Sequence, residues 1–131
     1  MPNLPQGLTD EQFTEISAKV RAAVAHLGTD VAVHGSRAAG TATASSDLDI
    51  AIRVSAERFE EILSLRFGTP KAGSAKEKTL LHARQTGKIH SGEAGLRSLR
   101  KALEKDLGMP VDVSVIREGG PFDSGPYVAL K

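Results

Sequence analysis

The chain of 131 residues contains no cysteine and no tryptophan. Without cysteine it can form neither disulfides nor thiolate metal sites, and it has no thiol nucleophile. Any metal ion must therefore be held by oxygen or imidazole ligands, and oxygen ligands suit Mg²⁺ or Mn²⁺. One tyrosine and four phenylalanines are too few to form the aromatic platform on which bases of single-stranded nucleic acid stack.

Long apolar runs are also missing, because no stretch approaches the roughly 20 residues that a membrane-spanning helix needs. The N-terminal segment, Met1–Gly7, is short, polar and proline-bearing, unlike a secretory signal peptide. We therefore expect a cytoplasmic protein without a membrane partner. The alternative is a fragment whose secretion signal lies elsewhere.

Charge is unevenly distributed, although the formal net charge is only +1. From Arg66 to Lys105 there are ten basic and three acidic residues, so this segment carries about +7 and the rest of the chain about −6. A basic segment in the same chain as a carboxylate site favours a phosphate-rich partner or a nucleic-acid-binding role. Solvated helix faces would give the same pattern, so both interpretations stay open.

Apolar spacing predicts a mixed fold. Apolar residues alternate with polar or small ones over 47–54 and 111–116, which indicates two strands with one buried face each, and the run 31–34 indicates a third. Expected helices open at capping residues and close at glycine; they span 9–27, 55–67, 74–86 and 91–107. A brief helix fits 37–44, and 117–131 is expected to be an extended tail packed on the domain. Composition and length fit one domain, 1–131, of the α/β (α+β) class, with helices covering one face of a small mixed sheet.

The strand at 31–34 ends in Gly35-Ser36, the first half of the candidate site. A strand that turns into a helix leaves free backbone N–H groups, which bind anions. Gly35 permits close approach of a phosphate, the Ser36 hydroxyl can donate to a phosphate oxygen, and Arg37 can add positive charge. His34, just before the turn, is interpreted as structural rather than substrate-binding. Alone the turn is weak support, because Gly-Ser turns are common.

Asp47 and Asp49 form the second half of the site. Two residues apart on a strand, they project to the same face. Paired carboxylates repel each other and suit a divalent ion between them. If the strand carrying Asp112 pairs beside theirs, three carboxylates converge, an arrangement that supports two-metal phosphoryl or nucleotidyl transfer.

Gly35-Ser36, ten intervening residues, Asp47-x-Asp49 and the later Asp112 resemble the DNA polymerase beta superfamily of nucleotidyltransferases, and its minimal nucleotidyltransferases most. The resemblance covers 31–54, with support from 111–116. It implies the nucleotidyltransferase fold, with Ser36 at the nucleotide and with Asp47, Asp49 and Asp112 as catalytic metal ligands for Mg²⁺ or Mn²⁺. The segment 55–110 is longer than in the smallest members.

The same resemblance implies an enzyme that transfers a nucleoside monophosphate from a nucleoside triphosphate such as ATP to a hydroxyl. The acceptor would be an RNA 3′ end, such as that of a transfer RNA, or a protein. Lys78 and Lys88 are further candidates for binding the nucleotide, although a solvated helix face explains them equally well.

Glycine-rich motifs near the C-terminus, among them 119–126, resemble nucleotidyltransferase domains of bacterial polymorphic toxins. That resemblance implies delivery into the cytoplasm of a competing cell and a cognate immunity protein or antitoxin as partner. The alternative function is a non-catalytic module of the same fold that binds a nucleotide or a partner, as an antitoxin does. The presence of all three acids argues against such a degenerate module.

Overall fold

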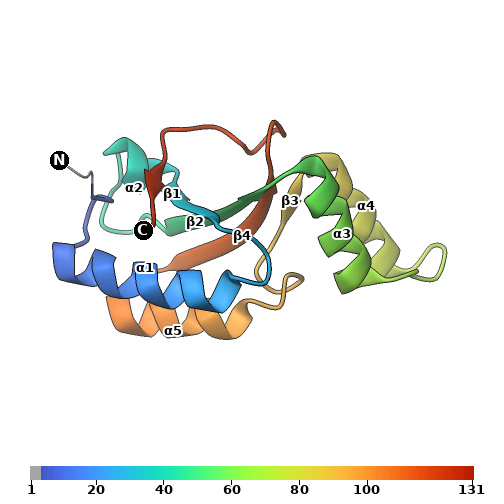
Figure 1. The fold of residues 1–131 in the computed structure, drawn as a ribbon, viewed down its shortest axis with the longest axis horizontal. Helices are drawn as coiled ribbons and strands as arrows, with labels where there is room; N and C mark the ends of the chain where they lie inside the picture. Colours follow the sequence, from blue (N-terminus) through green and yellow to red (C-terminus); the bar gives the residue numbers. More distant parts are fainter. Residues whose placement is uncertain (1–3) are drawn as a thin grey trace.

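The computed structural model describes residues 4–131. Within them, helices and strands are interleaved along the chain, with α3 followed by α4 and β4 by β5 (Figure 1). The helices are α1 (Asp10–Val24), α2 (Ser36–Ala39), α3 (Ala56–Phe67), α4 (Ala75–Thr86) and α5 (Arg97–Leu107). The strands are β1 (Asp30–His34), β2 (Leu48–Val54), β3 (Lys88–Ile89), β4 (Val111–Arg117) and β5 (Val128–Ala129).

The strands form one mixed sheet in the order β3-β4-β2-β1-β5. β1 runs antiparallel to β2 and to β5, and β3 runs antiparallel to β4. The two long central strands, β2 and β4, run parallel. Parallel neighbours need a long crossover connection, and the segment 55–110 with α3, α4 and α5 supplies it. The predicted mixed sheet of three or more strands is confirmed.

The register gives the sheet an apolar face. Ile50 of β2 lies beside Val33 of β1 and Val113 of β4, and all three are fully buried. Helices α1 and α5 lie side by side against this face (Figure 1). The apolar sides of α1 and α5 face the same core, in which Val20 of α1 and Leu103 of α5 are fully buried. Burial of this apolar face stabilises the fold.

The opposite face of the sheet is polar. Here His34 of β1 lies beside Asp49 of β2, and Asp49 lies beside Asp112 of β4. A loop formed by residues 118–127 is fastened to this face, because Asp123 accepts hydrogen bonds from Arg53 of β2 at 2.8 and 3.0 Å. The polar face is therefore divided between a carboxylate site and the attachment point of the loop.

Helices α3 and α4 pack against each other beyond one end of the sheet, and α2 lies at the other end (Figure 1). Helices α3 and α4 begin where the sequence predicts, since the side chains of Ser55 and Ser74 accept hydrogen bonds from backbone N–H groups of the first turn. The basic side chains of α4 thus lie away from the turn at Gly35. None of the helices within residues 4–131 is long and apolar enough to cross a lipid bilayer.

The start of α5 differs from the prediction. The helix was expected to begin at Ser91, but it begins at Arg97. Residues 91–95 form turns instead, with Gly95 at a φ of +75°. Glycine makes this left-handed conformation accessible, and it ends any continuous helix there. The turns fold the chain back toward the sheet and bring Ser91 and Glu93 to the cavity described below.

The two short strands were not predicted. Lys88 and Ile89 pair with the outer side of β4, and Val128 and Ala129 pair with β1. A strand of two residues is too short to show an alternation of apolar and polar side chains. Only the pairing with β4 and with β1 therefore defines β3 and β5. The C-terminal segment, expected to be an extended tail packed on the domain, is thereby joined to the sheet through β5.

Candidate active site

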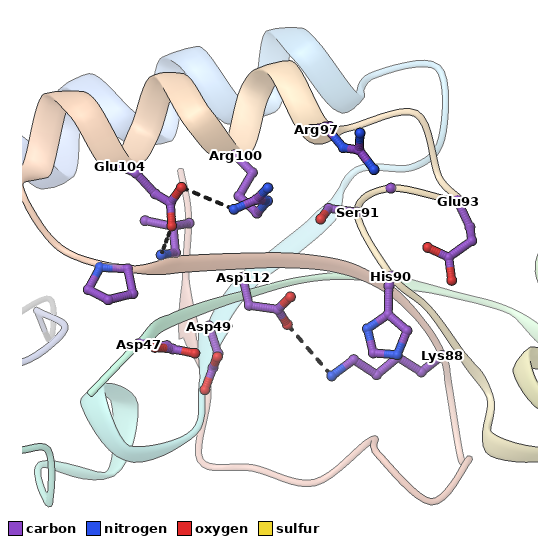
Figure 2. A pocket seen from close by; sticks show the side chains of 13 residues that line it. Asp47, Asp49, Lys88, His90, Ser91, Glu93, Arg97, Arg100, Glu104 and Asp112 are labelled. Carbon is purple, nitrogen blue, oxygen red and sulfur yellow. Dashed lines mark hydrogen bonds and ion pairs between the residues drawn. The ribbon is translucent and has the colours of Figure 1, made fainter. Parts of the chain in front are cut away.

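Asp49 of β2, Asp112 of β4 and Asp47, just before β2, line one cavity of about 620 Å³ (Figure 2). Asp49 and Asp112 are direct register partners on the parallel strands β2 and β4, whose backbones lie about 4.8 Å apart. Asp47 immediately precedes β2 and is exposed. The parallel pairing of β2 with β4 thus brings together acids that lie up to 65 residues apart along the chain, 112 minus 47.

The carboxylates repel one another. Burial raises the pKa of the Asp49 carboxyl above its usual value, and the neighbouring charges of Asp112 and Asp47 raise it further. Asp112 accepts a hydrogen bond from the Ser114 hydroxyl at 3.0 Å and lies 3.6 Å from the Lys88 ammonium. The described lining of the cavity holds five carboxylates but three Lys or Arg side chains, Lys88, Arg97 and Arg100, so the cavity is short of positive charge.

Gly35 makes close contact with this carboxylate group. Its φ is +72°, and a Cβ atom at this position would collide with the Asp49 carboxylate. Both the backbone conformation and the close approach require glycine here. The turn therefore lies directly against Asp49, so a group bound to the turn is adjacent to the acids.

The donor set fits a hard divalent cation. All three candidate ligands are carboxylates, which Mg²⁺ and Mn²⁺ prefer, and a cation would offset the repulsion that raises the pKa of Asp49. Within residues 4–131, no group of three His, Asp or Glu side chains is already close enough to hold a metal ion. The three carboxylates therefore line one cavity without forming a ready-made metal site.

Arg37 does not have the predicted place beside the phosphate turn. It is only 5% exposed, and its guanidinium donates to the carbonyl oxygens of Gln6 and Ser46, each at 2.8 Å. Because Ser46 precedes Asp47, Arg37 positions the segment that leads into the carboxylates. Lys78 lies on α4 and is not part of the cavity wall, so the structure supports neither residue as a nucleotide ligand. Lys88 lines the cavity, and its role as a nucleotide ligand stays a prediction.

The wall opposite the acids is formed by α5 and the turns before it (Figure 2). Arg97 and Arg100 line this wall, whereas His90 follows β3 and lies beside Lys88 (Figure 2). Arg100 donates to Glu104 at 3.0 Å. Glu104 also accepts from the backbone N–H of Val111 at 3.1 Å, which ties α5 to the start of β4. Sequence reasoning missed this wall. The signal was present, because spacings of three and four residues place these side chains on one side of a helix.

A second cavity of about 400 Å³ adjoins the first. It lies between the turn after β1 and the loop 118–127. Its described lining is His34, Gly35, Ser36, Ala39, Thr41, Pro121, Phe122, Ser124, Gly125 and Pro126. The turn that was predicted to bind phosphate thus lines this second cavity and not the charged one, and the described lining of the second cavity holds no Asp, Glu, Lys or Arg.

His34 connects the second cavity to the loop. Its ring stacks on Tyr127, with 6.2 Å between ring centroids and 29° between the planes. Burial lowers the pKa of the His34 imidazole, and Lys88 lowers it further, although Asp112 and Asp123 act in the opposite direction. The imidazole is therefore neutral at pH 7, and its buried Nε2 atom has no hydrogen-bond partner within residues 4–131.

The loop itself is held by Asp123. This carboxylate accepts from Arg53, from the Tyr127 hydroxyl and from the backbone N–H of Gly119, the last at 2.8 Å. The hydrogen bond from Arg53 is the main reason why the pKa of Asp123 lies far below its usual value. The loop is thus fixed in place by an ion pair that is largely shielded from water, with 9% of the Asp123 side chain exposed.

Comparison with known proteins agrees with this geometry. No curated protein and no solved structure matches the chain. A family model described as "Nucleotidyltransferase domain" matches residues 14–128, a span that contains the turn at Gly35 and all three carboxylates. The match confirms the resemblance to the minimal nucleotidyltransferases of the polymerase beta superfamily: the chain belongs to the nucleotidyltransferase domain family.

Proposed function

We propose that this protein uses a divalent cation to transfer a nucleoside monophosphate from a nucleoside triphosphate to an acceptor hydroxyl. The observation that carries the proposal is the pairing of Asp49 with Asp112 across β2 and β4, with Asp47 and the Gly35-Ser36 turn beside them. The membership in the nucleotidyltransferase domain family supports nucleotidyl transfer in general. The residue roles, the cation and the acceptor are part of the proposal.

In this reaction the acceptor oxygen forms a bond to the α-phosphorus, and the bond from that phosphorus to the bridging oxygen breaks. Pyrophosphate leaves with the electron pair of that bond, and the acceptor hydroxyl gives up its proton to solvent water. Asp47, Asp49 and Asp112 would hold Mg²⁺ or Mn²⁺. When bound, the cation offsets phosphate charge and lowers the pKa of a coordinated hydroxyl.

The protein's own groups then position the substrate. The Ser36 hydroxyl, which lines the second cavity, donates to a phosphate oxygen, and such hydrogen bonds to charged groups are stronger than neutral ones. Lys88 pairs with Asp112 in the structure at 3.6 Å. A cation bound to Asp112 would replace that pairing and free the Lys88 ammonium to contact a phosphate.

The acceptor that the site favours is an RNA 3′ end. The wall opposite the acids carries Arg97 and Arg100, with Glu93 and Glu104 beside them, and guanidinium groups bind nucleic-acid phosphates. A protein hydroxyl remains the second acceptor class. The glycine-rich C-terminal segment supports a role as a toxin that is neutralised by an immunity protein or antitoxin, and the three acids disfavour a purely binding module.

One experiment tests the enzyme proposal directly. The protein is incubated with each labelled nucleoside triphosphate, Mg²⁺, total RNA and cell lysate, and the labelled species are separated. We expect label on RNA with the parent and none with Asp49→Asn. Asp106→Asn, which changes an exposed carboxylate on α5, is the matched control and should label like the parent. Equal labelling by Asp49→Asn would leave a non-catalytic binding module as the better account.

A further inference from the structure

The loop between α2 and β2, residues 40–46, leads directly into the carboxylates and has no hydrophobic anchor. Its residues are glycine, alanine, serine and threonine, and none of them is buried. Asp47, which follows the loop, lies one residue before the first register pair of β2 with β4. The pairing of the sheet therefore does not fix Asp47, and its place in the cavity depends on hydrogen bonds that hold the loop.

The end of the loop is held by its own backbone and by Arg37. The Thr43 N–H donates to the Ser46 hydroxyl at 2.9 Å, and the Ser46 N–H donates to the Thr43 carbonyl at 3.1 Å. The buried guanidinium of Arg37 donates to the Ser46 carbonyl from Nε at 3.2 Å and from Nη2 at 2.8 Å. These bonds fix the backbone immediately before Asp47.

A second set of contacts comes from the segment before α1, residues 5–8, which lies beside α2 and the loop (Figure 1). The Gln6 side chain pairs with the backbone of Ala42: its Nε2 donates to the Ala42 carbonyl at 3.0 Å, and its Oε1 accepts from the Ala42 N–H at 2.8 Å. The Gln6 backbone pairs with Arg37, because its N–H donates to the Arg37 carbonyl and its carbonyl accepts from the guanidinium, each at 2.8 Å. Gln6 thus joins the middle of the loop to the residue that holds its end.

The segment itself is anchored to the body of the protein. Pro5 and Leu8, on either side of Gln6 and Gly7, are buried, and Leu8 belongs to the hydrophobic core. Gly7 has a φ of +92°, and a Cβ atom there would collide with the Arg37 guanidinium, so the backbone passes close to Arg37. Because the segment is fixed to the core, it can hold the small-residue loop in one place.

From these contacts we infer that Gln6 is a positioning residue of the active site: through Ala42 and together with Arg37, it holds the loop 40–46 so that Asp47 faces the divalent cation. The inference rests on the proposed function and deepens it. The described lining of the charged cavity does not include Gln6, so Gln6 acts through the loop. The segment also lies outside residues 14–128, which match the family model, so the family match does not account for its role.

Hydrogen exchange followed by NMR tests the hold on the loop. In Gln6→Ala, the N–H groups of Thr43 and Ser46, whose hydrogen-bond partners lie within the loop, should exchange about 5- to 30-fold faster, the range of one to two lost hydrogen bonds. The N–H of Leu48, which donates to the Pro110 carbonyl at 2.9 Å, should exchange as in the parent. Faster exchange at Leu48 to the same extent would indicate a general folding defect and overturn the local role.

Binding of Mn²⁺ alone, followed by electron paramagnetic resonance of the free ion, tests the effect on Asp47 without requiring transfer. We expect Gln6→Ala to weaken Mn²⁺ binding about 3- to 10-fold, less than the roughly 10- to 100-fold loss typical of a group that contacts a metal ligand directly. Asp47→Asn should weaken binding more. Adding Gln6→Ala to Asp47→Asn should cause no further loss, because changes that act through one group are not additive. A full further loss in the double variant would overturn the inference.

Gln12→Ala is the matched control. It removes another glutamine side chain near the same end of the chain, one that accepts from the backbone N–H of Thr9 at 3.0 Å, and it should change neither exchange in the loop nor Mn²⁺ binding. Transfer by Gln6→Ala should need more Mg²⁺ for half its maximal rate, by the same factor as the loss in Mn²⁺ affinity, and should recover most of its rate at saturating Mg²⁺.

The outcomes separate this inference from the proposed function. If the parent labels RNA but Gln6→Ala matches it in exchange, Mn²⁺ affinity and Mg²⁺ dependence, the positioning role is wrong and the transferase stands. If the parent neither binds Mn²⁺ nor labels RNA, the proposed function fails, and the positioning role toward a cation fails with it.

Discussion

Two aspartates on the polar side of the sheet have opposite electrostatic environments. Asp49 lies beside Asp112 and Asp47, and burial and like charge raise its pKa. Asp123 accepts hydrogen bonds from Arg53, Tyr127 and Gly119, and its pKa is far below the usual value. The fold therefore disfavours the charged form of Asp49 and favours the charged form of Asp123.

This difference in pKa distinguishes Asp49, a candidate functional carboxylate, from Asp123, a structural one. Groups whose pKa values are perturbed by burial and like charge in a cavity are candidates for function. A carboxylate with all its partners in place instead stabilises the native structure. Substitution of Asp49 should therefore lower the transfer rate, whereas substitution of Asp123 should lower the free energy of unfolding.

The largest effect is expected at Asp49. Asp49→Asn keeps the shape but removes a charged ligand, and it should lower the transfer rate by about 100- to 1000-fold, equivalent to several kcal/mol of transition-state stabilisation. The melting temperature should not fall, because the substitution relieves repulsion with Asp112 and Asp47. Rates come from single-turnover labelling and stability from circular dichroism. A variant that melts well below the parent would place Asp49 with the structural carboxylates.

Asp123 should show the reverse pattern in stability. Asp123→Asn leaves the Arg53 guanidinium without its shielded partner, and we expect the free energy of unfolding to fall by about 2–3 kcal/mol. Urea denaturation measures the change. Asp106→Asn is the control, because its partner Lys19 is exposed and exposed ion pairs contribute at most about 1 kcal/mol. Equal losses for the two variants would show that Asp123 has no special structural role.

The contributions of Asp123 and Asp49 to the free energy of unfolding should change with pH in opposite directions. Asp123 has a folded pKa below its unfolded value of 3.8, so its contribution is complete above that value and is lost as the pH falls through the folded pKa. Asp49 has a folded pKa above 3.8, so it favours the folded state at low pH, and that contribution is lost as the pH rises through the folded pKa.

Urea denaturation of the parent and both variants between pH 2 and 7 resolves these contributions. The difference in unfolding free energy between parent and Asp123→Asn should shrink as the pH falls below about 4. For Asp49→Asn, the variant should gain stability relative to the parent as the pH rises above about 4. The same sign of change in both variants would contradict the contrast.

The sequence predicted the central strands and most helix boundaries well. Strands 31–34, 47–54 and 111–116 lie within one residue of β1, β2 and β4 at each end, because alternation reflects directly which face is buried. Thr9 and Gln12 form the predicted capping box. These features depend on local chemistry, which a sequence shows.

The incorrect or missing predictions depend on distant contacts. Arg37 was expected at the nucleotide, but the carbonyl oxygens that hold it belong to Gln6 and Ser46, which no local pattern reveals. The wall with Arg97 and Arg100 reaches the acids only because α5 packs beside β4. The carboxylates themselves were predictable, since the pairing of two alternating strands fixes which side chains share a face.

The smallest effect we predict is on the stability of the parent in Mg²⁺. A cation that binds the native acids and not the unfolded chain stabilises the protein by RT ln(1 + [L]/Kd), or about 1.4 kcal/mol at tenfold excess over Kd. Because the cation would neutralise the repulsion around Asp49, the gain should disappear in Asp49→Asn and persist in Asp123→Asn. Thermal melts with and without Mg²⁺ and a nucleoside triphosphate measure it, and Na⁺ at equal ionic strength controls for screening. If Mg²⁺ and triphosphate leave the melting temperature of the parent unchanged, the acids do not hold the cation. An equal gain in Asp49→Asn would move the binding site to other residues.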